Sequence, residues 1–312
     1  MNAAHSSPKP DIRLAVSAGI GSLSVAVLLT GMKVWALWQT GSLAVATSLA
    51  DSALDLLMSA AALAAIIYAA KPEDDEHSFG HHAVEDLAVL AQSLLVLGSA
   101  GVIAWLSIGR LMSSTPPTLA NETAGSAAML LSMLITFCLV AWQSHVVRKT
   151  GNQVVAADRL HYLSDLLPSM GAILALQLSQ RLGWTHADAV IGLIAAAYMI
   201  RSAAQQGGSA WNALMDHQAD PEVIATVTRL ADSWPGVLGW HDLQTRRSGS
   251  RNFIHLHVEL DGTQPLKTAH DIGAGLRAAI LRELPDSYVI IHKDVWQDHD
   301  HTSGEARNSV DR

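Results

Sequence analysis

Two pairs of ionisable residues interrupt apolar stretches that are long enough to cross a membrane. Asp51 and Asp55 lie in GSLAVATSLADSALDLLMSAAALAAIIYAA, and His161 and Asp165 lie in ADRLHYLSDLLPSMGAILALQL. Each pair is spaced i, i+4 and therefore falls on one face of its helix. A charge at the bilayer centre costs about 2.5–3.5 kcal/mol on insertion scales, so such residues mark functional sites. Three carboxylates and one imidazole suit a divalent cation such as Zn²⁺, and the alternative is a polar network that joins helices.

The composition favours a membrane domain followed by a polar domain. Half of the residues are hydrophobic and 15% are charged, against about 25% charged in an ordinary soluble domain. Residues 13–210 carry 21 Asp, Glu, Lys or Arg, whereas the shorter segment 211–312 carries 25, with eight of the fifteen histidines. We expect an N-terminal arm (1–12), a transmembrane domain (13–210), a soluble domain (211–297) and a disordered tail (298–312).

Charge, cysteine content and the first residues exclude several classes of protein. The net charge of −8 argues against a nucleic-acid partner. Cys138 is the single cysteine, so no intrachain disulfide is expected. The opening MNAAHSSPKPDIR is polar and is not expected to be a cleaved signal peptide.

Hydropathy predicts an α-helical membrane protein with six transmembrane helices. A bilayer requires roughly 20 apolar residues for each span, and the spans fall at approximately 14–38, 43–70, 86–110, 123–147, 153–179 and 186–207. Basic residues concentrate in alternate connections, as they do on the cytoplasmic side of a membrane. We therefore expect a multi-pass protein of the cell inner (plasma) membrane with both termini cytoplasmic. The residues that indicate this orientation are Lys9, Arg13, Lys71, Arg148, Lys149 and Arg201.

The polar segment is expected to form a small α+β domain in the order αββαβ. PEVIATVTRLADSW and PLKTAHDIGAGLRAAILREL have amphipathic helical patterns, with Pro221 near the start of the first. GWHDLQTRRSG and RNFIHLHVELD alternate with period two, and Ser248-Gly249-Ser250 between them predicts a hairpin turn. SYVIIHKD is a short apolar strand. These elements predict an open sheet with helices on one face.

The chain resembles the cation diffusion facilitators, and most closely their bacterial zinc and ferrous-iron efflux branch. The resemblance rests on DSALD, HSFGH and HYLSD in that order, with SWPGVLGWHDLQTRRSG, FIHLHVEL and VIIHKD after them. It extends over nearly the whole chain. It implies a homodimeric metal/proton antiporter that exports metal from the cytoplasm, with a ferredoxin-like cytoplasmic domain and no enzymatic activity.

The resemblance implies that Asp51, Asp55, His161 and Asp165 converge on one transported ion. Independent chemistry supports coupling to protons, because carboxylates and imidazole bind metal only when they are deprotonated. A site that exchanges metal and protons on opposite sides of a membrane is an antiporter. The site must be accessible from each side of the membrane in turn, and transporters achieve this by rocking one bundle of helices against another.

Two further metal-binding clusters are implied by the resemblance. Asp74, His77 and His81 in KPEDDEHSFGHHAVED match a second metal site, and three ligands leave a position for water. The alternative is a solvated acidic loop. The third cluster is a cytoplasmic binuclear zinc site near the dimer interface, where the alternative is scattered surface histidines. Its ligands are expected to be His241, His257, His270, His292 and Asp294.

One position departs from the family pattern. The branch often has a lysine two residues after HSFGH, which pairs across the dimer with an aspartate after the sixth span. Ala83 stands at the lysine position, whereas the aspartate is present as Asp216. The charge pair between protomers is therefore expected to be missing or rebuilt.

The types of ligand limit which metal ions the site can hold and which functional classes the protein can belong to. A set of three aspartates and one histidine fits Zn²⁺, Cd²⁺ and Fe²⁺, whereas Mn²⁺ favours oxygen alone and Cu⁺ favours sulfur. A passive divalent-cation channel would not need a closed ligand set. An intramembrane metalloenzyme would need an open position and a base such as that of HExxH, which the sequence lacks. A metal sensor without transport is disfavoured by the complete set of four ligands.

Overall fold

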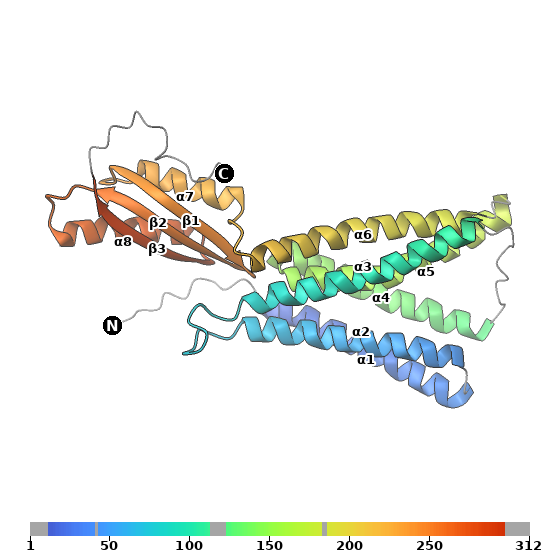
Figure 1. Cartoon of the computed structure of the whole chain (residues 1–312). Helices are drawn as coiled ribbons and strands as arrows, with labels where there is room; N and C mark the ends of the chain where they lie inside the picture. The colour runs from blue at the N-terminus through green and yellow to red at the C-terminus, as the bar shows by residue number, and fades with distance from the viewer. Residues whose placement is uncertain (1–11, 41–42, 113–122, 183–185, 297–312) are drawn as a thin grey trace. The chain divides into compact units, whose positions relative to one another are not determined.

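The computed structural model describes residues 12–40, 43–112, 123–182 and 186–296 (Figure 1). The predicted disordered tail and most of the N-terminal arm lie outside the described residues. Some helical residues, including Asp51 and Pro168, are described by their backbone alone. The described residues form two compact units, one ending at Trp211 and the other beginning at Asn212.

Six long helices make up the first unit, at the positions where six spans were predicted. Four stretches among the described residues are long and apolar enough to cross a membrane: Ile12–Trp35, Ser52–Ala69, Ala83–Met112 and Leu131–Thr150. The fifth and sixth helices are of similar length but are not among them, so the count of six spans stays a prediction. The helices are α1 (Ile12–Thr40), α2 (Leu43–Ala69), α3 (Ala83–Met112), α4 (Thr123–Thr150), α5 (Gln153–Leu182) and α6 (Ala187–Leu214).

The helices alternate in direction, so their ends gather at two ends of the bundle (Figure 1). We call the end where α1 begins and α6 finishes the proximal end. α5 packs against both α3 and α4, and α1 packs against α2 and α4. Small residues allow the close approach, since a Cβ on Gly19 of α1 would lie 2.9 Å from Leu63 Cδ1 of α2.

An apolar cluster fills the proximal end of the bundle and draws on all six helices. Its buried members are alanine, valine and isoleucine side chains, which leave little space for water. The cluster contains Ala15, Ala18, Ala62, Ile66, Val89, Val146, Val154, Val155, Ala157 and Ala210. We refer to it below as the proximal apolar cluster.

The second unit has the predicted αββαβ order. Its elements are α7 (Pro221–Ser233), β1 (Gly239–Ser248), β2 (Arg251–Leu260), α8 (Leu266–Glu283) and β3 (Ser287–Val295). The strands are ordered β1-β2-β3, with β1 and β2 antiparallel and β2 and β3 parallel. Gly249 takes φ +54° in the predicted turn between β1 and β2, a conformation that favours glycine.

Alternation along β2 assigns the two faces of the sheet. Ile254, Leu256 and Val258 are buried in one core with residues of both α7 and α8. Both helices therefore cover the same face, as predicted. His255 and His257 point to the opposite face because successive strand residues alternate, and they are only partly buried. The fold class is confirmed as a helical membrane domain joined to a small α+β domain.

Candidate metal centres

The first group of candidate ligands joins α2 to α5. Ligand atoms of Asp55, His161 and Asp165 all lie within 4.8 Å of one another. His161 Nε2 is 3.1 Å from Asp55 Oδ1, although the two are not aligned as a hydrogen bond. His161 is buried, whereas Asp165 is exposed. The i, i+4 spacing on α5 thus brings His161 and Asp165 together, and helix packing adds Asp55. Asp51 lies one turn before Asp55 on α2, but its side chain is outside the described residues.

A lysine that the sequence analysis missed lies beside this group. Lys33 of α1 donates from Nζ to Ser52 Oγ at 2.6 Å, and its charge is close enough to act on Asp165. Thr30 Oγ1 donates to the Ser52 backbone oxygen at 3.1 Å. A lone lysine within the apolar run of the first span was the available signal. Its ammonium offsets part of the negative charge that two or more carboxylates bring into the bundle.

Asp158 is a second residue that sequence reasoning missed. It precedes His161 by three positions and Asp165 by seven, so all three share a helix face. Asp158 is buried and accepts hydrogen bonds from Ser22, Gln143 and Gln92 on three other helices. It is not among the grouped metal ligands. The extended i, i+3, i+7 pattern of charged residues was the signal in the sequence.

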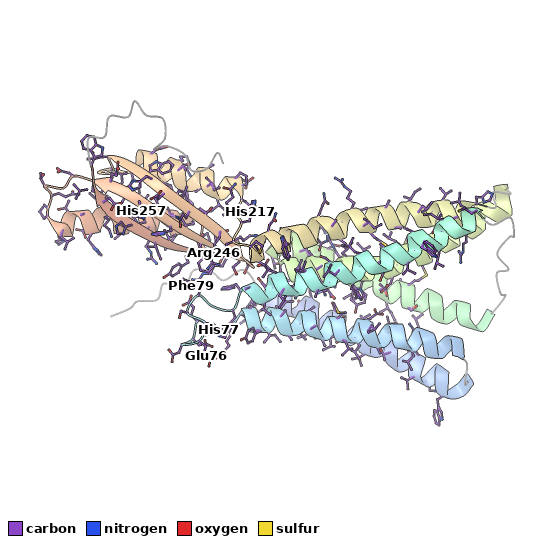
Figure 2. All side chains as sticks on the ribbon, viewed as in Figure 1. Glu76, His77, Phe79, His217, Arg246 and His257 are labelled. Atoms are coloured by element: carbon purple, nitrogen blue, oxygen red, sulfur yellow. The ribbon has the colours of Figure 1, made fainter. Side chains whose placement is uncertain are left out.

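The second group lies in the loop between α2 and α3, where Figure 2 labels His77. Ligand atoms of Asp74, His77 and His81 all lie within 4.8 Å of one another. Asp74 Oδ1 accepts from the backbone N–H of His77 at 2.8 Å, and Asp74 Oδ2 is 3.3 Å from His81 Nε2. Gly80, at φ +86°, allows the turn between the two histidines. The three predicted residues are therefore close together.

A lysine also lies beside this second group. Lys71 Nζ is 2.9 Å from Asp74 Oδ2. This hydrogen bond, with the backbone N–H of His77, holds the pKa of the half-buried Asp74 carboxyl well below its usual range. The same contact raises the pKa of Lys71. The carboxylate is thus ionised and ready for a metal, but a tethered cation already occupies one oxygen.

The third group crosses the sheet on the face opposite the helices. In register, His241 of β1 pairs with His257 of β2, which pairs with His292 of β3. Asp294 Oδ2 is 2.8 Å from His257 Nδ1 and 3.4 Å from His241 Nε2. Asp294 Oδ1 is 3.2 Å from His292 Nε2. Three imidazoles therefore surround one carboxylate, and Figure 2 labels His257 in the middle of the sheet.

Local backbone geometry and charge shape this third group. The register of β1 and β2 shifts between His241 and Gln244, and such a bulge re-aims side chains at a sheet edge. Partial burial opposes ionisation of Asp294, but the His257 hydrogen bond and three neighbouring imidazoles leave its pKa lowered. Glu259, which the sequence analysis did not select, adds an oxygen 3.5 Å from His241 Nδ1. Its position two residues after His257 on the same strand face was the signal.

His270 is the one predicted cytoplasmic ligand that the fold does not bring to this group within a single chain. It lies near the start of α8 and is exposed. α8 packs on the core face of the sheet, whereas His241, His257 and His292 occupy the other face. Sequence spacing could not reveal this separation, because it follows from which face α8 covers.

Asp216, the expected partner of the missing lysine, has a partner within its own unit. Its Oδ1 accepts from Arg246 Nη1 at 2.9 Å, and Figure 2 labels Arg246. Ala83, at the lysine position, is the first residue of α3 and is exposed.

Comparison with known proteins identifies two consecutive matches. The family described as "Cation efflux transmembrane domain" matches residues 20–215, and "Cation efflux protein, cytoplasmic domain" matches residues 219–295. The cation-efflux pump FieF of Escherichia coli O1:K1 is 40% identical over 282 residues, which cover 90% of this chain and 93% of that protein. The same protein of Escherichia coli strain K12 has the same identity and coverage.

Solved structures of the MamM C-terminal domain resemble part of the chain. The one titled "MamM-CTD 215-293" is 20% identical, with 24% of this chain and 96% of that chain covered and a TM-score of 0.23. A nickel form of a variant of that domain is 19% identical, with 25% and 100% covered and a TM-score of 0.24.

Replacing Lys71 with methionine should strengthen metal binding at the loop group. The ammonium no longer competes for Asp74 Oδ2, and we expect the Zn²⁺ dissociation constant to fall about three- to tenfold. Because Asp74 stays ionised well above its lowered pKa, the ratio should be the same at about pH 6 and about pH 8. Calorimetric titration of a chain also carrying Asp55→Ala and His257→Ala isolates this site. Lys267→Met, which removes an exposed lysine paired with Asp271 at 3.0 Å, should change nothing.

Proposed function

Because the chain belongs to the cation efflux family, we propose that it exports a divalent metal cation from the cytoplasm in exchange for protons. It is a multi-pass membrane transporter rather than an enzyme. The observation that carries the proposal is the group of Asp55, His161 and Asp165, whose ligand atoms come from two helices and lie within 4.8 Å of one another. We propose Asp51, one turn away on α2, as the fourth ligand.

The chemistry of this group explains why export and proton uptake would be coupled. A carboxylate or imidazole that holds a proton has no free lone pair for metal, so the two cargoes exclude each other. Metal that leaves on one side is replaced by protons, and the protonated site returns to the other side. Zn²⁺ is the cargo that the mixed nitrogen and oxygen set favours, with Fe²⁺ and Cd²⁺ as alternatives.

We propose that six spans place the proximal end of the bundle in the cytoplasm. Lys71, Arg148 and Lys149 lie at this end, as cytoplasmic basic residues do. Arg201, which the sequence analysis also used, lies midway along α6. With this orientation, we propose the division into an N-terminal arm (1–12), a membrane domain (13–210), a cytoplasmic domain (211–297) and a tail (298–312).

The loop and sheet groups are proposed as accessory metal sites on the cytoplasmic side. Asp74, His77 and His81 offer three ligands, of which His77 is exposed and His81 is buried. Three ligands leave a position for water, which suits weak capture of an ion. His241, His257, His292 and Asp294 would hold regulatory Zn²⁺. In a homodimer, the exposed His270 can complete the site of the partner chain, which accounts for its separation from the group in its own chain.

Each proposed transport ligand should be needed for flux. We expect Asp51→Ala, Asp55→Ala, His161→Ala and Asp165→Ala each to lower Zn²⁺ flux by about a hundredfold or more, since one lost ligand opens the coordination shell. Flux is measured in proteoliposomes at matched protein density. Glu76→Ala, an exposed loop carboxylate, serves as the control and should transport normally. Near-normal flux for Asp55→Ala or Asp165→Ala would contradict the assignment.

Proton coupling should appear in both binding and flux. Titration of the transport site between about pH 5.5 and about pH 7.5 should show proton release with metal and weaker binding at the lower pH. A pH gradient that is acidic outside should accelerate export, and collapsing it should slow export. Flux that ignores the gradient, together with binding that releases no protons, would favour a passive channel.

Zn²⁺ should stabilise the cytoplasmic unit. Bound metal stabilises the state that holds its ligands together, so the melting temperature of a fragment from Asn212 onward should rise with Zn²⁺. His257→Ala with His292→Ala should remove most of this rise. The effect of His270→Ala should depend on protein concentration, because its imidazole would act across the dimer. Melting curves and sedimentation with and without Zn²⁺ measure both effects, and no response in either would exclude the regulatory site.

A further inference from the structure

A buried polar cluster separates the transport group from the proximal end of the bundle. The Asp158 cluster consists of Ser22 on α1, Gln92 on α3, Gln143 on α4 and Asp158 on α5. All four side chains are at most 2% exposed. Asp158 precedes His161 by three residues on α5, which places it about 4.5 Å nearer the proximal end.

Hydrogen bonds tie the four helices together at this level. Asp158 Oδ2 accepts from Ser22 Oγ at 2.5 Å and from Gln143 Nε2 at 2.7 Å. Asp158 Oδ1 accepts a longer bond from Gln92 Nε2 at 3.5 Å. Gln143 Nε2 also lies 3.0 Å from Ser22 Oγ. One carboxylate is thus the shared acceptor for donors from three neighbouring helices.

A tyrosine one turn further along α5 adds a fifth helix, α2, to the same layer. Tyr162 OH lies 2.9 Å from Ser59 Oγ of α2 and donates to the Ser22 backbone oxygen at 3.1 Å. Tyr162 is itself buried. Five of the six helices therefore meet in one hydrogen-bonded layer between the transport group and the proximal apolar cluster.

The two sides of the transport group differ in burial. Toward the proximal end lie the Asp158 cluster and then the proximal apolar cluster, both buried. On the other side Asp165 is exposed. A metal ion moving between the proximal end and the transport group would have to pass both layers, so these layers must separate at some stage of transport.

We propose that the Asp158 cluster is the latch that keeps the cytoplasmic side of the transport path closed. The inference rests on the proposed function, since only a transporter needs this side to open. Asp158 acts as a positioning residue: its bonds draw α1, α3 and α4 onto α5 in the closed state. When the helices separate, its carboxylate loses these donors and gains water. Because hydrogen bonds in a buried, fully connected polar network are strong, the latch biases the equilibrium toward the closed state.

The test measures how readily a reporter thiol on the cytoplasmic side becomes accessible. In full-length protein carrying Cys138→Ser, Ala62→Cys places a thiol in the proximal apolar cluster, where Ala62 is 2% exposed. A membrane-impermeant maleimide is applied to the cytoplasmic face of inverted vesicles. We expect Asp158→Ala to raise the labelling rate about tenfold or more, because three donors lose their acceptor.

Further variants separate the latch from general loosening of the bundle. Ser22→Ala removes one donor and should raise labelling less, which also provides a milder variant if Asp158→Ala does not fold. Asp158→Asn keeps an acceptor oxygen for Ser22 and Gln143 and should label more slowly than Asp158→Ala. Ser144→Ala removes a hydroxyl that donates to Val140 O of its own helix, and this variant should label like the parent.

A stability-matched control and the flux of the parent complete the design. Leu139→Ala removes a buried apolar side chain on α4 and lowers the melting temperature without removing a bond of the cluster. The latch is wrong if Asp158→Ala and Ser22→Ala fold but are labelled no faster than the parent. It is also wrong if Asp158→Asn is labelled as fast as Asp158→Ala, or if Leu139→Ala is labelled as fast as Asp158→Ala. Any of these labelling results would contradict the latch without bearing on the proposed function, which the metal flux of the parent tests. If the parent shows no metal flux, the proposed function is wrong, but the labelling result still stands.

Discussion

The membrane unit is organised by the high free energy of an unpaired charge or polar group in a low-dielectric helix bundle. Ligand atoms of Asp55, His161 and Asp165 lie within 4.8 Å of one another. Asp158 receives donors from three other helices. Each buried polar residue therefore constrains the packing of several helices. This constraint links the transport group to the Asp158 cluster, because Asp158, His161 and Asp165 lie on consecutive turns of α5.

Lysines lie beside two of the three candidate metal groups. Lys33 acts on Asp165, and Lys71 contacts Asp74. In each place an ammonium offsets the charge of carboxylates when no divalent ion does so. A tethered cation of this kind lowers metal affinity and so favours release, which a transporter requires as much as binding. In the third group three imidazoles lie around Asp294.

The cytoplasmic unit obeys a different constraint, the period of two along a strand. Burying Ile254, Leu256 and Val258 under α7 and α8 turns His257 to the other face of the sheet. The register then aligns His241 and His292 with it. Because α8 covers the core face, His270 is separated from these three. The role proposed for His270 at this group therefore requires a partner chain.

Much of this architecture was readable from the sequence because its signals are local. Apolar length predicted the helices, alternation predicted the strands, and the i, i+4 spacing paired His161 with Asp165 before any helix was packed. The roles of Lys33, Gln92 and Gln143 were not readable, since each depends on a contact with a residue far along the chain. The partner of Asp216 was likewise set by the position of Arg246. Sequence alone determined which residues share a helix turn or a strand face. Only tertiary structure decided which turns and faces meet, because packing free energy depends on all the helices together.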